Sequence, residues 1–489
     1  MQIKKIMNAA QKTIQNAELV LIQRGIYIAT TFLFAFFIPR LMGPSRYGQF
    51  ALLYSLSFMF TMLSDFGVIQ VMGRYIPQLR LGGEIENSKK LLNSFLMLTL
   101  SSGTLAAVLY FFVTHLWLKD IHVLSLLTMA AAVLIRSSTN PLFSFFLGLN
   151  QAARWGSRDV LSRLLSIPLL IFFFNLGGLP GACLGVLLTE GFILILGVGW
   201  GRHYLSWPHM RLDFHFLYPY LQFGLFFFIS HLTSTAIQQG GGVLIRILNP
   251  DYTQVSYFEL AQKIFLTASF AYPQFSLSFA PHMTVLLKKG KTDILQQWTE
   301  QLLKWLTVAG VGMMFTFLFL GEDMVRLILG KDYQPVAINL LPLSVSFFFL
   351  ALSNVSNLLT LIYEKPKVAL HGSLLRLAVF WGFGFLSISF WGSFGGCLAL
   401  LLASILSAGY LTWRTQTYLP YSLKRSMAAL GSGVFFLPLI FFKSSLPVNI
   451  FLFGLFLTGY IMVLFLFRII TWPEVRTLGQ TITSGITRS

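Results

Sequence analysis

Six basic side chains lie within stretches of this sequence that otherwise have the apolar composition of a membrane span. They are Arg24, Arg136, Arg163, Lys263, Lys304 and Arg376. A cation at membrane depth is energetically costly, so such residues usually face a cavity, a partner or a substrate. Because all six carry the same sign, they indicate a polar interior that attracts anions.

Three of these cations are candidates for a path that binds anionic cargo. At about 1.5 Å rise per residue, Arg136 and Lys263 lie roughly 16–21 Å into their spans, close to the midplane. Arg136 has no acidic residue three or four positions away, so it either faces the lumen or pairs with a carboxylate from another helix. Lys263 has Glu259 four positions earlier, and this pair serves either cargo or proton coupling or is a buried structural ion pair. Arg24, near the start of the first span, either binds head groups or forms part of the cytoplasmic mouth, and we favour a role in binding cargo.

The other three cations are predicted to be structural. Arg163 stands 20 residues before Cys183, and Arg376 stands 21 before Cys397, so the two share a repeated position. Lys304 has Glu300 four residues earlier on the same helix, which favours local neutralisation.

Acidic residues are the candidates for coupling or gating. Asp65 and Glu190 lie at or within predicted spans. Asp65 is alternatively a helix-end residue or a partner of Arg24 or Arg74.

Uncharged polar residues are the candidates for sugar recognition. His231, Gln238 and Asn354 are predicted to hydrogen-bond substrate hydroxyl groups. The alternative for each is a packing residue with its polar atoms satisfied inside the protein.

The composition is that of a polytopic membrane protein. The 489 residues are 55% hydrophobic and 11% charged, with a mean hydropathy of +0.72. The net charge of +18 fits basic cytoplasmic loops better than nucleic-acid binding, which we exclude. Two cysteines give neither a disulfide framework nor a cysteine zinc site, and we expect no metal. No nucleotide-binding loop is visible, so no cofactor is expected.

Hydropathy predicts 14 spans, each of roughly 20 residues. They lie near 18–41, 47–70, 91–113, 122–149, 158–175, 178–201, 216–238, 252–281, 293–320, 336–362, 367–388, 392–413, 424–442 and 447–470. With the N-terminus in the cytoplasm, the inside segments hold 22 Lys and Arg residues and the outside loops 7. This bias predicts that both termini are cytoplasmic.

A duplication organises the chain. Arg40-Leu-Met-Gly-Pro44 returns as Arg246-Ile-Leu-Asn-Pro250, and Gly181-Ala-Cys183 returns as Gly395-Gly-Cys397. Six spans per copy is an even number, so the two copies are related by an axis along the membrane normal. The predicted parts are an interfacial amphipathic segment (1–17), an N-terminal lobe (18–203), a C-terminal lobe (204–414), two further spans (424–470) and a cytoplasmic tail (471–489). The fold class is therefore all-α, with two six-helix lobes in parallel pseudo-two-fold repeat plus two C-terminal helices.

Several short motifs resemble those of a transporter superfamily. They are Gln23-Arg24-Gly25, Arg40-Leu-Met-Gly-Pro44-Ser-Arg-Tyr47-Gly48, Asp65-Phe66-Gly67 and Gly73-Arg74-Tyr75-Ile76. With them, the chain resembles the multidrug/oligosaccharidyl-lipid/polysaccharide exporter superfamily, and more closely its polysaccharide-synthesis branch of Wzx-type flippases. The resemblance covers about residues 18–470.

This resemblance implies a function in surface polysaccharide assembly. The protein is expected to be a flippase that moves a polyprenyl-pyrophosphate-linked oligosaccharide, such as an O-antigen unit of lipopolysaccharide, across the cytoplasmic (inner) membrane by alternating access. Expected partners are membrane lipids and the lipid-linked substrate, with a polysaccharide polymerase and a chain-length regulator as further candidates. The alternative is a cation-coupled drug or metabolite antiporter of the same fold. We expect no enzyme activity, because the short outer loops leave no room for a catalytic domain.

Overall fold

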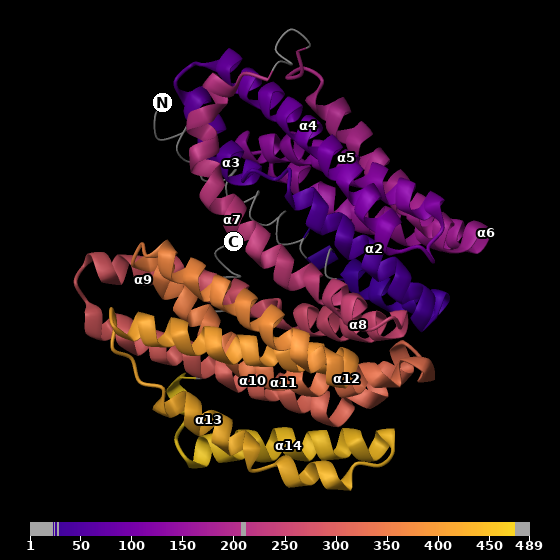
Figure 1. Ribbon diagram of the computed structural model, residues 1–489. Helices are drawn as coiled ribbons and strands as arrows, with labels where there is room; N and C mark the ends of the chain where they lie inside the picture. The colour runs from indigo at the N-terminus through magenta and orange to yellow at the C-terminus, as the bar shows by residue number, and fades with distance from the viewer. Residues whose placement is uncertain (1–22, 24, 27–28, 207–211, 475–489) are drawn as a thin grey trace. The chain divides into compact units, whose positions relative to one another are not determined.

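The computed structural model describes the whole chain except residues 1–22, 24, 27–28, 207–211 and 475–489 (Figure 1). The predicted interfacial segment (1–17), Arg24 and nearly all of the predicted tail therefore lie outside the described residues. The described residues form helices joined by short loops, as the sequence predicts for an all-α membrane protein. They divide into two compact units, an N-terminal unit that ends at Ser256 and a C-terminal unit that begins at Tyr257.

Nine helices in the described residues are long and apolar enough to cross a membrane. Two of them, α6 and α12, each contain two of the predicted spans joined at a kink. The remaining predicted spans correspond to the helix Ala29–Met42 and to the helix pairs α2–α3 and α8–α9. The expected polytopic fold of about 14 spans is thus confirmed.

The N-terminal unit contains six labelled helices and the start of a seventh. Their bounds are α2 (Pro44–Met62), α3 (Val68–Leu81), α4 (Ile85–Trp117), α5 (Val123–Gly148), α6 (Ala152–Gly201), α7 (Phe214–Leu248) and α8 (Tyr252–Ser269). A buried apolar cluster that includes Phe95, Phe143, Phe145 and Leu217 joins the helices α3 to α7. The structure therefore groups α7 with the N-terminal helices, whereas the sequence repeat assigns it to the second copy.

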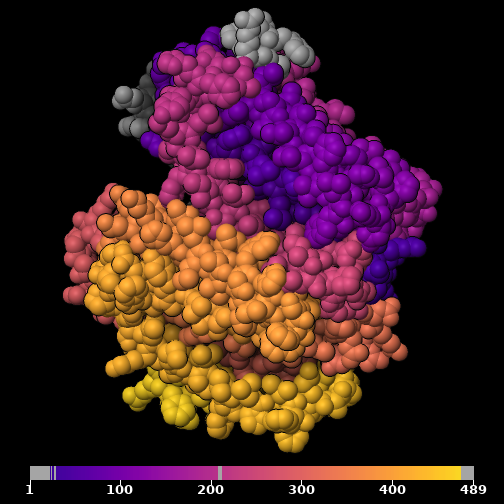
Figure 2. All heavy atoms as spheres, viewed as in Figure 1, coloured from indigo at the N-terminus to yellow at the C-terminus, as the bar shows by residue number. Residues whose placement is uncertain are grey.

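The C-terminal unit contains the remaining helices (rose-red through orange to yellow in Figure 1). Their bounds are α9 (Ala271–Lys288), α10 (Thr292–Ile328), η2 (Lys331–Tyr333), α11 (Gln334–Ile362), α12 (Pro366–Gln416), α13 (Lys424–Val434), η3 (Leu437–Phe442) and α14 (Leu446–Leu466). An aromatic core joins α10 to α14, where the Phe315 and Phe456 rings stack with centroids 4.0 Å apart. On the face shown in Figure 2, the orange and yellow side chains of this unit pack closely.

The two hairpins α6 and α12 explain why part of the duplication is visible in the sequence. Gly178 (φ 59°, ψ −137°) and Gly392 (φ 55°, ψ −131°) turn the chain in nearly the same conformation, one that only glycine adopts readily. Just after each turn the two arms touch, and a side chain at Gly181 or Gly395 would collide with a backbone carbonyl of the opposite arm. The repeated glycines are therefore required by close helix packing.

The second predicted span of each copy is broken, which hydropathy did not indicate. Residues 63–67 separate α2 from α3, and Phe270 separates α8 from α9. At the first break Phe66 and Gly67 have positive φ values of 45° and 67°. Gly67 lies against the backbone of Gly224 on α7, where a side chain would not fit. The first break therefore places polar residues 64 and 65 inside the N-terminal unit.

Candidate functional site

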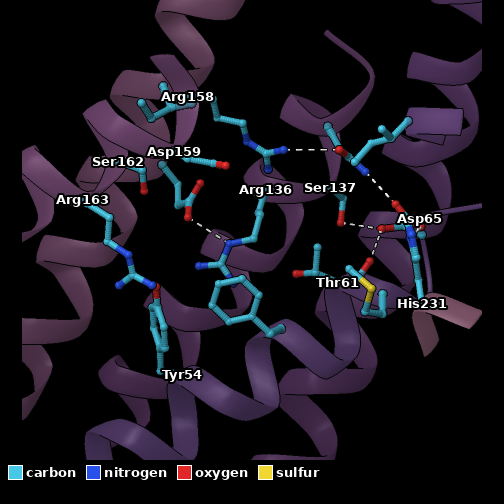
Figure 3. Close-up of a pocket in the computed structure, with 17 residues that line it drawn as sticks. Tyr54, Thr61, Asp65, Arg136, Ser137, Arg158, Asp159, Ser162, Arg163 and His231 are labelled. Carbon is cyan, nitrogen blue, oxygen red and sulfur yellow. Dashed lines mark hydrogen bonds and ion pairs between the residues drawn. The ribbon is translucent and has the colours of Figure 1, made fainter. Parts of the chain in front are cut away.

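A cavity of about 260 Å³ lies within the N-terminal unit (Figure 3). Charged and hydroxyl-bearing side chains from α2, the 63–67 break, α5, α6 and α7 surround it. Its lining consists of Tyr54, Phe58, Thr61, Met62, Ser64, Asp65, Ile69, Arg136, Ser137, Asn140, Arg158, Asp159, Ser162, Arg163, Glu190, Ile193 and His231. Several candidates that lie far apart in the sequence therefore meet at one place.

Arg136 forms an ion pair with Glu190, which is the alternative that the sequence left open. Its Nε donates to Glu190 Oε1 over 2.9 Å, and its Nη1 donates to Ser57 Oγ over 3.1 Å. The guanidinium also lies over the ring of Phe58, 4.0 Å from the centroid. Both charged side chains are at least nine-tenths buried. In a medium of low polarity this pairing offsets the cost of burying both charges.

Asp65 connects the break in the second span to two other helices. Its Oδ1 accepts a hydrogen bond from Asn140 Nδ2 on α5 over 2.8 Å, and its Oδ2 lies 2.9 Å from His231 Nδ1 on α7. The other ring nitrogen of His231 lies 3.1 Å from Gln70 Nε2 on α3. A neutral imidazole protonated on Nδ1 satisfies both contacts, because it donates to Asp65 and accepts from Gln70. Neither Arg74 nor any other described cation forms an ion pair with Asp65, apart from this histidine.

Four polar residues in the first arm of α6 face the same cavity, in addition to Glu190 in its second arm. Arg158, Asp159, Ser162 and Arg163 are spaced so that they form one side of the helix. The Arg158 guanidinium donates to Asn140 Oδ1 over 3.3 Å and to Thr139 Oγ1 over 3.4 Å. Asn140 therefore links Arg158 to Asp65, and through Asp65 to His231.

The lining of this cavity is balanced in charge. It carries three guanidinium groups (Arg136, Arg158, Arg163) and three carboxylates (Asp65, Asp159, Glu190) beside His231. An excess of cations was the expectation from the six intramembrane basic residues. The helices of this unit supply the opposing charges, so the cavity is suited to a polar ligand with both donors and acceptors.

Other predicted site residues are not part of the lining of this cavity. Lys263 Nζ is 3.5 Å from Glu259 Oε2, so this pair on α8 is formed as its spacing suggests. Asn354 donates to the Leu350 carbonyl of its own helix over 2.8 Å. Gln238 is exposed on α7. Lys263, Asn354 and Gln238 do not line the cavity of the N-terminal unit.

The cations expected to be structural have different surroundings. Lys304 is fully buried, and its Nζ lies 2.9 Å from Glu474 Oε1 rather than pairing with Glu300. Arg163 lines the cavity and lies over the Phe34 ring at 5.3 Å. Arg376 is half-buried on α12, and its Nε has no hydrogen-bond partner among the described residues.

The hairpins also refine the relation between Arg163 and Arg376. Gly178 and Gly392, like Cys183 and Cys397, are 214 positions apart. At that offset Arg376 corresponds to Ser162, one position before Arg163. One residue is about 100° around a helix, so the two arginines point in different directions relative to their hairpins.

Sequence reasoning missed Arg158, Asp159 and Asn140 as cavity residues. Arg158 is the first residue of the predicted span 158–175, but α6 begins six residues earlier, at Ala152. The first turns of α6 are too polar for a hydropathy window to include them. The signal that was available is the four-residue spacing of Arg158 with Ser162 and of Asp159 with Arg163.

Comparisons with known proteins agree with this architecture. A family model described as "Polysaccharide biosynthesis protein" matches residues 12–284, more than half of the chain. Among solved structures, the lipid II flippase MurJ in an inward closed conformation is 13% identical, with a TM-score of 0.69 over 92% of this chain and 98% of that one. An inward-facing multidrug resistance MATE family transporter of the MOP superfamily is 14% identical, with a TM-score of 0.70 over 82% of this chain and 98% of that one. At such identities the likeness concerns the fold alone. No curated protein matches the sequence.

Proposed function

This chain belongs to the polysaccharide biosynthesis protein family, and from that premise we propose that it is a flippase for a polyprenyl-pyrophosphate-linked oligosaccharide. It moves this substrate across the cytoplasmic membrane by alternating access of its two lobes. The glycan and pyrophosphate pass through a polar interior while the polyprenyl tail stays in lipid. Both termini are cytoplasmic, as the 22-to-7 distribution of Lys and Arg predicts.

The observation that carries this proposal is the cavity of the N-terminal unit. It is built from spans that are otherwise apolar, yet three arginines, three carboxylates and several hydroxyl groups line it. Ionised groups inside a membrane protein are retained mainly where they serve transport or binding. At about 260 Å³ the cavity is small for a ligand site and accommodates part of such a substrate.

In this proposal the charged groups have distinct tasks. Arg136 and Glu190 keep the cavity polar as a neutral pair, and Asp65 with His231 is the coupling or gating contact. Lys263, Glu259, Gln238 and Asn354, which are not lining residues of this cavity, remain proposed substrate contacts, and so does Arg24. Surface polysaccharide assembly, with a polymerase and a chain-length regulator downstream, is the proposed setting.

The test is direct measurement of flipping. Purified protein in liposomes, supplied with a fluorescent polyprenyl-pyrophosphate oligosaccharide, should move the glycan to the opposite leaflet. Accessibility to a membrane-impermeant glycosidase is the readout. In cells, removing the gene should leave lipid-linked oligosaccharide facing the cytoplasm and abolish the surface glycan. Protein-containing liposomes that behave as empty ones do would reject the proposal.

One observation favours a second candidate, a cation-coupled drug or metabolite antiporter. The carboxylates Asp65, Asp159 and Glu190 line the same cavity and are groups that bind organic cations or protons. Efflux of a cationic dye from vesicles, driven by a proton or sodium gradient and abolished by Asp65→Asn, would select this alternative.

A further inference from the structure

Arg136, the deepest cation of the N-terminal cavity, is not available to an anionic ligand. Glu190, Ser57 and the Phe58 ring occupy the sides of its guanidinium. Its third nitrogen, Nη2, has no hydrogen-bond partner among the described residues, but it is buried. A phosphate would have to displace a carboxylate that is itself buried and would then lack a partner. Replacing one partner of such a pair is strongly unfavourable.

Arg158 differs from Arg136 in each of these respects. It is half-buried, and its contacts with Asn140 and Thr139 are long, at 3.3 and 3.4 Å, and involve neutral acceptors. Among the described residues, no carboxylate oxygen lies within 4.0 Å of a guanidinium nitrogen of Arg158. Charge-assisted bonds to a phosphate oxygen are shorter and about twice as strong as bonds of the kind that it now makes. An anion in the cavity can therefore replace its present partners at little cost.

The position of Arg158 fits a ligand that arrives from one end of the cavity. Arg158 lies near the start of α6, the end that the positive-inside pattern predicts to be cytoplasmic, and its side chain extends over the cavity in Figure 3. Arg163, five residues further along the helix, adds a second positive charge to the lining, and the exposed carboxylate of Asp159 opposes them.

We propose that Arg158 binds a phosphate group of the lipid-linked substrate at the N-terminal cavity, and that Arg136 does not. This inference rests on the proposed flippase function and assigns a residue to its pyrophosphate. When Arg158 turns to the phosphate it releases Asn140, whose amide also donates to Asp65. Binding at Arg158 thereby loosens one of the two contacts that hold Asp65 in place.

The test compares ligands that carry the lipid, the pyrophosphate or both. Farnesyl pyrophosphate, inorganic pyrophosphate and farnesol are titrated into the full-length protein in detergent, with binding followed by calorimetry. Arg158→Gln should weaken binding of farnesyl pyrophosphate about tenfold, which corresponds to the loss of one charge-assisted contact. Binding of farnesol should not change. Asp159→Asn should strengthen binding of farnesyl pyrophosphate several-fold, because it removes a nearby negative charge.

Arg154→Gln is the matched control. Arg154 is an exposed arginine one turn earlier on α6, it lies over the Phe146 and Trp200 rings, and it is not in the cavity lining. The Arg154→Gln variant should bind farnesyl pyrophosphate with the affinity of the native protein. A thermal melt monitored at the buried thiol of Cys183 shows that each variant is folded.

The outcomes separate this inference from the proposed function. If the native protein flips a lipid-linked glycan but Arg158→Gln binds farnesyl pyrophosphate with native affinity, the role of Arg158 is refuted and the flippase function stands. If Asp159→Asn weakens binding, the assignment is refuted too. If inorganic pyrophosphate and farnesyl pyrophosphate bind with equal affinity, the proposal that the bound phosphate belongs to a lipid-linked ligand is refuted. If the native protein flips no lipid-linked glycan, the proposed flippase function itself is refuted.

Discussion

Each unit of this protein buries an ion pair between residues distant in sequence, but the two pairs have different neighbours. Arg136 and Glu190 in the N-terminal unit line a cavity with further charged groups. Lys304 and Glu474 in the C-terminal unit lie beside Trp305, which packs on the aromatic core of α10 and α14. Burial and pairing are common to both, so these properties alone do not mark a functional residue. The surrounding space and polar groups make the difference.

Removing one partner of each pair should give the largest effect. Arg136→Met leaves the buried Glu190 without its cation and should destabilise the protein by about 3–5 kcal/mol. Lys304→Met should cost less, about 1–3 kcal/mol, because Glu474 is 20% exposed and keeps the Thr471 amide as a donor.

Thermal melts with a thiol-reactive dye can measure this difference. Cys183 and Cys397 are both buried, so single-cysteine variants report the two units separately. Equal melting of Arg136→Met and the native protein would mean that the ion pair contributes nothing to folding.

Neutralising both partners at once should separate function from folding. Arg136→Met with Glu190→Gln leaves no unpaired charge but makes the cavity wall apolar. Flipping should fall at least tenfold while the protein still folds, since the polar lining is lost. Lys304→Met with Glu474→Gln should flip within about twofold of the native rate, because that pair contributes packing alone. Similar loss in both double variants would contradict the distinction between the two pairs.

Asp65→Asn should reduce the rate of flipping by about tenfold, which corresponds to the loss of one hydrogen bond to a charged group. The asparagine keeps the shape of the side chain but weakens its contacts with His231 and Asn140. Gln222→Ala is a suitable control, because Gln222 lies on α7 and bonds only Tyr218 of the same helix in the described residues. Native flipping by Asp65→Asn would exclude Asp65 from coupling.

The partly exposed ion pair of Lys90 and Asp213 should give the smallest effect. Lys90 Nζ lies 2.8 Å from Asp213 Oδ2 at the start of α7. The hydrogen bond from Lys90, aided by the Phe216 amide, lowers the pKa of Asp213. A lowered folded-state pKa stabilises the protein above the unfolded value of about 3.9, and this contribution is lost as pH falls through the folded pKa. Asp213→Asn should therefore change the melting temperature only slightly at neutral pH and not at all in acid. A large change at neutral pH would make this pair comparable with the buried ones.

The sequence predicted the helices well and their interruptions poorly. Hydropathy located the spans because a run of apolar residues needs only local composition. The break at residues 63–67 escaped it, because Phe66 and Gly67 are as apolar as their surroundings and their positive φ values depend on the packing of Gly67 against Gly224. The start of α6 was placed six residues late, and this error concealed Arg158.

Pairing was predictable only within one helix. The Lys263–Glu259 pair follows from a spacing of four residues, since such positions are neighbours on a helix surface. The same rule predicted Lys304 with Glu300, but Lys304 pairs with Glu474, 170 positions later. The spacing along one helix suggests an ion-pair partner, but tertiary packing can bring a different partner closer.

The sequence by itself determined that this is a duplicated, polytopic helical membrane protein, because hydropathy, loop charge and repeated glycines are properties of short segments. Only the tertiary structure decided which charges neutralise one another. Arg136 lies 54 positions from Glu190, and Asp65 lies 166 from His231. Nothing in the spacing of the chain encodes such contacts, because they depend on how whole helices pack. The sequence predicted an interior with an excess of cations, whereas the helix packing forms a cavity with equal numbers of arginines and carboxylates. Arg158 is its proposed phosphate-binding residue.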